Sequence, residues 1–319
     1  MRVKMLLYNI YDKYMKISYG IASKNIDVTD ICFKRLRSGN YIIIPSGDEN
    51  RAFFFSDPLV KVLKSIFITD NNGITSEYNA NIKIYIDITK NIVYQNKLSD
   101  TMIEDATNDI LSIIHNSLKI KHGSFNQELP EQKMAVRYLT GNEKILEIGG
   151  NIGRNSIVIS YILGKHNNNL VVLECDPVSY NQLKENRDIN NLDFQIENSA
   201  LSKRKLIQKG WDTIPSDTLL DGYTEVNTIG LDALKAKYNI EFDTLVLDCE
   251  GAFYYILQDM PEILKNVNLI IMENDYHDIS HKRYVDTVLE ANNFKTDYIE
   301  AGGWNPCYPA FFEVWKRII

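Results

Sequence analysis

The sequence is short of the residues that would mark a disulfide-rich or zinc-finger protein. Its 319 residues contain four cysteines, which are far apart, with no Cys-x-x-Cys pair and no histidine at ligand spacing. No zinc site can therefore be predicted, and a reducing compartment is the default. No run reaches the roughly 18 apolar residues that a membrane helix needs, and no signal-peptide pattern opens the chain. We expect a cytoplasmic protein with no membrane partner.

An excess of positive charge is also missing. The net charge is −7 with a pI of about 5.4, which disfavours a polyanion-binding protein. The charge is uneven, because residues 1–98 hold 14 Lys and Arg against 9 Asp and Glu, a net +5, whereas the remainder carries −12. Two modules with different partners would explain this asymmetry, and ordinary variation between two solvated surfaces is the alternative.

Residues 1–98 predict a small β-rich domain, a sandwich or barrel. Short β-branched runs alternate with turn signals; the runs cover 40–46, 63–69 and 80–88, and the turns 46–50, 56–58 and 70–73. Residues 99–130 read as a helical linker, because 101–120 carries an apolar stripe at helical spacing. That stripe leaves three alternatives open: packing on the N-terminal domain, on the C-terminal domain, or on a second copy in a homodimer.

From residue 131 to 319 the chain alternates short apolar runs with helical patterns, which predicts an α/β domain built on a mostly parallel sheet. The expected strands are 144–148, 169–174, 193–197, 244–248, 268–273, 295–299 and 310–315, and the expected helices are 153–164, 177–190, 252–265 and 281–292. Ligands on such sheets bind beyond the carboxyl ends of the strands. Functional residues are therefore expected after residues 148, 174, 197, 248 and 273.

A glycine loop follows the first of these strands, and it reads Glu147-Ile148-Gly149-Gly150-Asn151-Ile152-Gly153. Its spacing departs from the dinucleotide G-x-G-x-x-G, and an acid before the glycines suits the amine and sulfonium cations of S-adenosylmethionine. The next strand ends in an acidic segment that can accept hydrogen bonds from ribose hydroxyls. The predicted cofactor-binding residues are Glu147, Gly149, Gly150, Asn151, Gly153, Glu174, Asp176, Ser199 and Ala200.

The ordered motifs over about 131–315 resemble FkbM-type S-adenosylmethionine-dependent methyltransferases. Leu146–Gly153 is similar to the family's DVGANIG opening, and the later motifs follow in family order: Glu174–Pro177, Asn186, Ala200–Ser202, Leu231-Asp232, Leu247–Ala252 and Glu273. The resemblance implies the class I methyltransferase fold, with a Rossmann-like seven-stranded sheet, and methylation of a hydroxyl on a sugar, glycan precursor or small metabolite. Glu147 replaces the usual Asp, Gly150 the usual Ala, and Phe253 a usual Glu, which puts that carboxylate's role in doubt.

A hydroxyl acceptor must lose its proton, so a base is expected near the strand ends. The predicted catalytic residues are Asp248, Glu250, Glu273 and His277, with Asp275 as a further candidate. The alternatives are a helix cap and first-turn acid for Asp248 and Glu250, and a surface loop residue for His277. Asp248 with Glu273 or Asp275 also offers the oxygen ligands that Mg²⁺ takes, but no spacing rule places such a site, so no metal ligand is predicted.

Other functions remain open at this point. A methyltransferase acting on an RNA ribose, with the positive N-terminal module docking the RNA, is one alternative, and a non-enzymatic scaffold with the same fold is another. Asn305-Pro306-Cys307-Tyr308 resembles the N-P-P-Y motif of nitrogen methyltransferases but lies near the last strand instead of after the fourth. The long segment 199–243, which contains Trp211, suits a substrate lid.

Overall fold

The chain is described by a computed structural model that covers residues 15–38, 41–95, 100–210, 212–304 and 306–318. It divides into two compact units, of which unit 1 is Met1–Ser112 with Val136–Thr140, and unit 2 is Ile113–Ala135 with Gly141–Ile319. The division falls inside helix α4 (Asp100–Ser117), within the segment that the sequence analysis assigns to a linker. Each unit has its own sheets.

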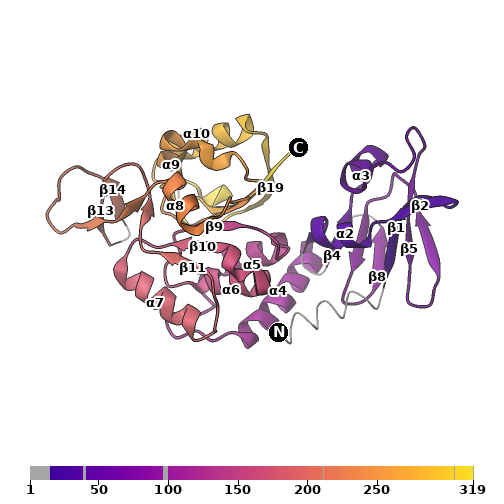
Figure 1. Ribbon diagram of the computed structural model, residues 1–319, viewed down its shortest axis with the longest axis horizontal. Helices are drawn as coiled ribbons and strands as arrows, with labels where there is room; N and C mark the ends of the chain where they lie inside the picture. Colours follow the sequence, from indigo (N-terminus) through magenta and orange to yellow (C-terminus); the bar gives the residue numbers. More distant parts are fainter. Residues whose placement is uncertain (1–14, 39–40, 96–99, 211, 305, 319) are drawn as a thin grey trace. The chain divides into compact units, whose positions relative to one another are not determined.

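Unit 1 contains two four-stranded antiparallel sheets, in agreement with the predicted β-rich domain. Their strand orders are β2-β1-β5-β6 and β3-β4-β7-β8 (Figure 1). The two sheets share one hydrophobic core, since Ile17 and Ile66 of the first pack in the same cluster as Ile42 and Ile84 of the second. The strands are β1 (Lys16–Ile21), β2 (Lys24–Asp27), β3 (Arg37–Ser38), β4 (Tyr41–Ile44), β5 (Ser65–Thr69), β6 (Thr75–Tyr78), β7 (Ile84–Asp87) and β8 (Ile92–Gln95).

Two helices in unit 1 were not predicted, α2 (Thr29–Arg35) and α3 (Asp48–Phe55). The predicted turn over 46–50 is wrong beyond Gly47, because α3 begins there. Gly47 has a φ of 92°, and the acids Asp48 and Glu49 in the first turn favour a helix amino terminus. Arg51 of α3 is fully buried, and its guanidinium donates to backbone carbonyls of three neighbouring segments.

Unit 2 is built on a seven-stranded sheet of order β11-β10-β9-β17-β18-β20-β19. Only β20 runs against its neighbours, so the predicted mostly parallel, Rossmann-like sheet is confirmed. Every residue of the central strands β9, β10 and β17 is buried, as expected for parallel strands covered on both faces. The strands are β9 (Ile145–Ile148), β10 (Leu170–Leu173), β11 (Gln195–Glu197), β17 (Thr244–Leu247), β18 (Leu269–Glu273), β19 (Phe294–Glu300) and β20 (Phe312–Arg317).

Helices cover both faces of this sheet. Figure 1 shows α6 (Arg154–Leu163) and α7 (Pro177–Asp188) on one face and α8 (Leu231–Tyr238), α9 (Phe253–Asp259) and α10 (Ile279–Ala291) on the other. The predicted helix 252–265 ends early: Pro261 cannot continue an α-helix, so the short 3-10 helix η2 (Pro261–Leu264) follows instead. Helix α8 was not predicted.

The segment after β11 forms small sheets of its own. β12 (Ala200–Leu201) pairs with β16 (Thr228–Ile229), and β13 (Leu206–Lys209) pairs with β14 (Asp212–Pro215) and β15 (Thr224–Val226). Figure 1 shows β13 and β14 projecting from the rest of unit 2. Trp211 and Asn305 lie outside the described residues. Among the residues that are described, no helix combines the length and apolar character needed to cross a bilayer.

Candidate active site

A cavity of about 610 Å³ opens beyond the carboxyl ends of β9, β10, β11 and β17. This position is the one expected for a ligand site on a parallel sheet, and the volume is typical of a small-molecule site. We call it the large cavity. The predicted site residues that line it are Gly149, Asn151, Glu174, Asp176, Ser199, Ala200, Asp248, Glu250 and His277.

The glycine loop uses its first amides to hold its own shape. The N–H groups of Gly149 and Gly150 both donate to the carbonyl of Leu173 at 3.0 Å. The N–H of Asn151 donates to Oε2 of Glu174 at 2.7 Å. Backbone amides at such a loop commonly bind phosphate when they are free. Here all three are already paired, so the loop is not arranged as a pyrophosphate cradle.

Gly149 also brings the loop against the next strand. Its φ is 90°, and a Cβ at this position would lie 1.5 Å from the carbonyl oxygen of Asp248. No side chain fits in that space. The absence of a side chain therefore lets the ends of β9 and β17 meet at the edge of the cavity.

Glu174 ties two loops together at the cavity wall. Besides the Asn151 amide, it accepts the N–H of Asp176 at 2.8 Å through Oε1. Its side chain is buried, and burial raises its pKa to about 7 although the two N–H groups favour the charged form. Each carboxylate oxygen has a second acceptor position that a ligand hydroxyl can use.

Asp176 caps the helix that follows. Its Oδ1 accepts the N–H of Ser179 at 2.7 Å, and Pro177 occupies the first turn of α7, as the sequence predicts. The same side chain lines the cavity, so its position is set by the helix amino terminus.

Asp248, Glu250 and His277 come from the ends of two strands. The proposed capping role of the two acids is wrong, because α9 begins at Phe253 with Ala252 at its N-cap and no side-chain cap bond. Burial raises the pKa of Asp248 well above its ordinary value, and burial together with the nearby Asp275 charge raises the pKa of Glu250. His277 is exposed, and its ring centroid lies 4.6 Å from that of Trp304.

The large cavity is acidic. Six carboxylate side chains line it. Among the described residues that line it, Arg204 is the one lysine or arginine. Arg204 is already engaged, since its guanidinium donates to both carboxylate oxygens of Asp259 at 2.6 and 2.8 Å. A ligand carrying hydroxyls or positive charge therefore suits this cavity better than a phosphate.

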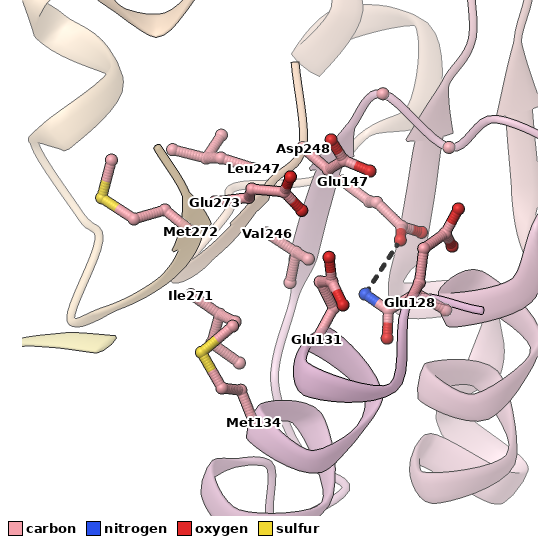
Figure 2. Close-up of a pocket in the computed structure, with 13 residues that line it drawn as sticks. Glu128, Glu131, Met134, Glu147, Val246, Leu247, Asp248, Ile271, Met272 and Glu273 are labelled. Atoms are coloured by element: carbon pink, nitrogen blue, oxygen red, sulfur yellow. Dashed lines mark hydrogen bonds between the residues drawn. The ribbon is translucent and has the colours of Figure 1, made fainter. Parts of the chain in front are cut away.

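A second cavity, the small cavity, adjoins the first. Its volume is about 10 Å³, the space of one water molecule, and Gly149 and Asp248 line both cavities. Figure 2 shows five carboxylates gathered around it, those of Glu128, Glu131, Glu147, Asp248 and Glu273. Burial raises the pKa values of Glu128 and Glu273, and raises that of Glu147 to about 8.

The predicted site residues are thus divided between two places. Glu147, Gly150 and Glu273 line the small cavity and not the large one. Gly153 lines neither; a Cβ there would lie 2.2 Å from Cδ1 of Leu183, so this glycine permits close packing between α6 and α7. Asp275 is buried and lines neither cavity.

Sequence reasoning missed several lining residues. Described residues between 201 and 215, together with Tyr255, form much of the wall of the large cavity. Those between 201 and 215 fall in the segment 199–243 that was predicted as a lid, but none of them was named as a site residue. Glu128 and Glu131 were missed at the small cavity; Glu131 lies in the first turn of α5 (Leu129–Tyr138), and Glu128 precedes the helix with a φ of 56°.

Comparison with known proteins leaves the family of the chain open. No protein-family model matches the sequence, and no curated protein matches it. The FkbM resemblance therefore stays a prediction.

Solved structures show a distant likeness. A candidate O-methyltransferase from Klebsiella pneumoniae has a TM-score of 0.39 and 17% identity, over 67% of this chain and 90% of that one. The ribosomal protein L11 methylase of Lactobacillus delbrueckii subsp. bulgaricus has a TM-score of 0.39 and 13% identity, over 62% and 81%. The O-methyltransferase of Bacillus cereus, solved with S-adenosylhomocysteine, has a TM-score of 0.37 and 14% identity, over 69% and 92%. At these values the likeness carries no functional argument, which rests instead on the geometry of the cavities.

Proposed function

We propose that the chain is an S-adenosylmethionine-dependent O-methyltransferase whose acceptor is a hydroxyl of a sugar, glycan precursor or small metabolite. The observation that carries this proposal is the pairing of the Asn151 amide with Glu174 at the edge of an acidic cavity. A glycine loop whose amides are occupied, beside acids that can accept hydroxyls, suits a nucleoside cofactor without phosphate. S-adenosylmethionine is such a cofactor, and when bound it supplies an electrophilic methyl group on a sulfonium.

The lining residues divide the cofactor's parts among themselves. Glu174 accepts hydrogen bonds from the ribose hydroxyls, because each of its carboxylate oxygens can accept a second hydrogen bond. Gly149 and Asn151 lie beside the methionine part, and Ser199 and Ala200 beside the base. The acids around the cavity favour a positively charged ligand over a phosphate-bearing one, so a dinucleotide is the poorer fit.

The acceptor side of the cavity needs groups that orient a hydroxyl and take its proton. Asp248, Glu250 and His277 line the cavity at the ends of β17 and β18; Glu250 and His277 are exposed, and Asp248 is half-buried. An imidazole is a common general base in enzymes. Holding the hydroxyl in line with the methyl group is the larger contribution that such a site makes. We assign the base to this trio.

The charge of the cavity narrows the acceptor class. Six carboxylates face the ligand, and Arg204 is held by Asp259, so a phosphorylated sugar or an RNA backbone would be repelled. A neutral polyol or glycoside is therefore the preferred acceptor. This charge argues against the RNA alternative for the large cavity.

Calorimetric titration of S-adenosylhomocysteine into the full chain tests the cofactor assignment. The wild type should bind, and Glu174→Gln should weaken binding about 10- to 100-fold, since hydrogen bonds to a charged group contribute about 1.5–3 kcal/mol. Glu225→Gln is the matched control, because Glu225 is exposed on β15 and does not line the cavity. Failure of the wild type to bind at millimolar ligand would refute the proposal.

Methyl transfer itself requires a second assay. Radiolabelled S-adenosylmethionine is offered with a panel of neutral methyl glycosides and with their 6-phosphates. Labelled product from the neutral set, lost in His277→Ala or Glu250→Gln, supports the assignment. Binding of S-adenosylhomocysteine without methyl transfer to any acceptor supports the scaffold alternative instead.

A further inference from the structure

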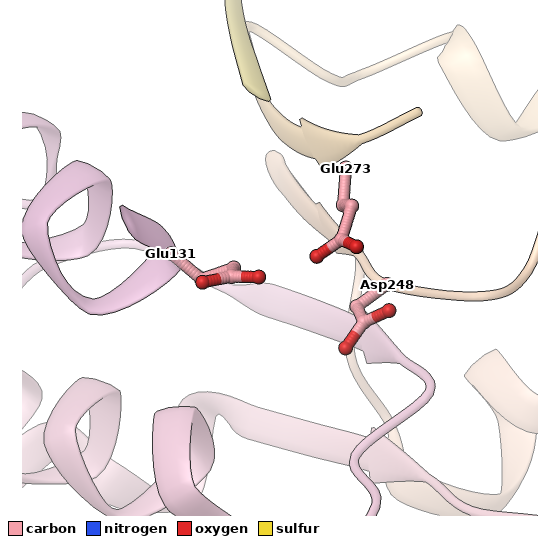
Figure 3. Close-up of side chains that lie close together, drawn as sticks. All are labelled: Glu131, Asp248 and Glu273. Atoms are coloured by element: carbon pink, nitrogen blue, oxygen red, sulfur yellow. The ribbon is translucent and has the colours of Figure 1, made fainter. Parts of the chain in front are cut away.

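Three carboxylates from separate elements converge at the small cavity. Glu131 lies in the first turn of α5, Asp248 follows β17, and Glu273 ends β18. One carboxylate oxygen of each lies within 4.8 Å of those of the other two. Figure 3 shows the three side chains pointing toward one another. Ligands brought together from three distant segments form a site with a defined geometry, because each is held by its own backbone element.

A second observation concerns acceptors that have no donor. Oε2 of Glu147, Oε2 of Glu131 and Oδ1 of Asn155 are buried without a hydrogen-bond partner, and all three residues line the small cavity. Their side chains belong to residues that are 3%, 6% and 8% exposed. Asn155 is the informative one, since it is neutral. Its Nδ2 donates to Oε1 of Glu147 at 3.4 Å, which leaves its carbonyl oxygen unpartnered.

Unpartnered buried acceptors are rare in folded proteins, and each one disfavours the folded state. A water molecule could satisfy one of them, but it would bring no positive charge to the carboxyl groups around the cavity. The described residues lining the small cavity include no lysine, arginine or histidine. Glu128, which also lines the cavity, pairs with Arg154. The side chains that line the cavity therefore bring acceptors and negative charge but no cationic group, and a cation would supply the missing charge.

We propose that the small cavity binds one divalent cation of the hard, oxygen-ligated class, Mg²⁺ or Mn²⁺. Glu131, Asp248 and Glu273 are the charged ligands, and the free oxygens of Glu147 and Asn155 complete the shell. The ligand set is entirely oxygen, which selects these ions over zinc or copper. The space of about 10 Å³ admits one ion and excludes a larger organic group.

The spacing of the oxygens is compatible with such an ion. Oxygens on one Mg²⁺ lie about 2.1 Å from the metal and so at most about 4.2 Å from one another. The three carboxylates need to close only slightly from their spacing of up to 4.8 Å. Side-chain rotation is sufficient, because each residue stands at the end of an element.

This site does not depend on methyl transfer. It shares Gly149 and Asp248 with the large cavity, so a bound ion would hold Asp248 at the boundary between the two. The ammonium group of a cofactor is a different cation that the same acids could receive. The experiment separates the two by presenting the metal without any cofactor.

Titration of Mn²⁺ alone into the full, EDTA-treated chain tests the inference, with free Mn²⁺ followed by electron paramagnetic resonance. We expect one saturable site per chain in the micromolar to sub-millimolar range, displaced by Mg²⁺. Glu131→Gln should weaken binding at least tenfold, and Glu273→Gln likewise. Glu290→Gln is the control, since Glu290 is exposed on α10, away from both cavities, and should leave binding unchanged.

Thermal unfolding provides the folding check, because neutral glutamine at an acidic cluster should leave each variant folded. Absence of saturable Mn²⁺ binding by the wild type overturns the inference, as does wild-type affinity for Mn²⁺ in both glutamine variants. Loss of S-adenosylhomocysteine affinity in Glu131→Gln without any Mn²⁺ binding by the wild type also overturns it, and assigns the acids to the cofactor's ammonium. Failure of the wild type to bind S-adenosylhomocysteine would count against the proposed function and not against the metal site.

Discussion

The two cavities of unit 2 are both acidic, and they differ in what holds their carboxylates. Glu147 and Glu174 illustrate the difference. Glu147 lies in β9, and Glu174 directly follows the adjacent strand β10. Glu174 accepts two backbone N–H groups, whereas one oxygen of Glu147 has a single long contact with Asn155 and the other has none. Backbone groups thus hold Glu174 in place at the large cavity, whereas buried acceptors at the small cavity have no partner.

The pKa values of the two glutamates also differ. Burial is the main cause in both cases, and it raises the pKa of Glu147 to about 8 and that of Glu174 to about 7. Glu174 has the lower value because its backbone N–H partners stabilise the charged form.

Gly149→Ala should have the largest effect, because Gly149 lines both cavities and lies against Asp248, which also lines both. The added Cβ would overlap the carbonyl oxygen of Asp248, and alanine at a φ of 90° is strained. Overpacking of this kind destabilises by about 1–3 kcal/mol or more. We expect a lowered unfolding midpoint and loss of affinity for both S-adenosylhomocysteine and Mn²⁺.

Gly230→Ala is its matched control. Gly230 has no atom within 4 Å of an added Cβ and a φ of −82°, so the unfolding midpoint should stay nearly constant. Differential scanning fluorimetry compares the two variants. Equal midpoints for Gly149→Ala and the wild type would contradict the close approach of β9 and β17.

Asp248→Asn should affect the binding of the two ligands differently, although Asp248 lines both cavities. Removing one charged ligand from three weakens Mn²⁺ binding at least tenfold. S-adenosylhomocysteine affinity should change less than threefold, because Glu174 and the loop carry that contact. Glu174→Gln should show the reverse pattern, and parallel calorimetry of both ligands measures it. A variant that loses both ligands equally would mean that the cavities act as one site.

The pH dependence of cofactor binding should follow Glu174. Its pKa of about 7 means that the carboxyl is mostly protonated at pH 6 and mostly ionised at pH 8. The ionised form accepts hydroxyls with both oxygens, so S-adenosylhomocysteine affinity should rise several-fold between these values and then level off. The rise should be absent in Glu174→Gln. An affinity that falls with pH in the wild type would contradict the assignment.

The same shift has a consequence for stability, with opposite sign. A carboxyl whose pKa is raised in the folded state loses its proton more easily when unfolded. Its contribution to stability is therefore full at pH below about 4.5, the unfolded value, and falls as the pH rises to about 7. Comparing urea midpoints of the wild type and Glu174→Gln between pH 5 and 8 should show the variant gaining on the wild type.

Asn151 should give the smallest effect. Its φ of 46° lies in the left-handed region, which asparagine tolerates better than alanine. Asn151→Ala should lower stability by about 1 kcal/mol, or roughly 2–4 °C, whereas Asn151→Gly should be nearly neutral. The N–H bond to Glu174 survives both changes because it uses the backbone. A larger drop for glycine than for alanine would show that the side chain itself has a role.

Much of the fold of unit 2 was predictable from local patterns. The central strands β9, β10, β17 and β18 are short apolar runs, and α7 has a clear start signal, Asp176 followed by Pro177. The elements that were missed had weak local signals: α3 begins inside a turn-like segment, and α8 lies in a long segment without a clear apolar face. The positions of acids at strand ends were predictable too, because parallel strands present their carboxyl ends at one edge.

What the amino-acid sequence determined by itself is the order of the elements and the presence of acids at their ends, since both follow from residue type and short-range periodicity. Only the tertiary structure decided which cavity each acid lines. Neighbouring positions on a strand point to opposite faces, and a one-residue difference at a strand end changes the side that a carboxylate reaches. Glu131 meets Asp248 and Glu273 because α5 packs beside the strand ends, and no local rule encodes contacts over such separations.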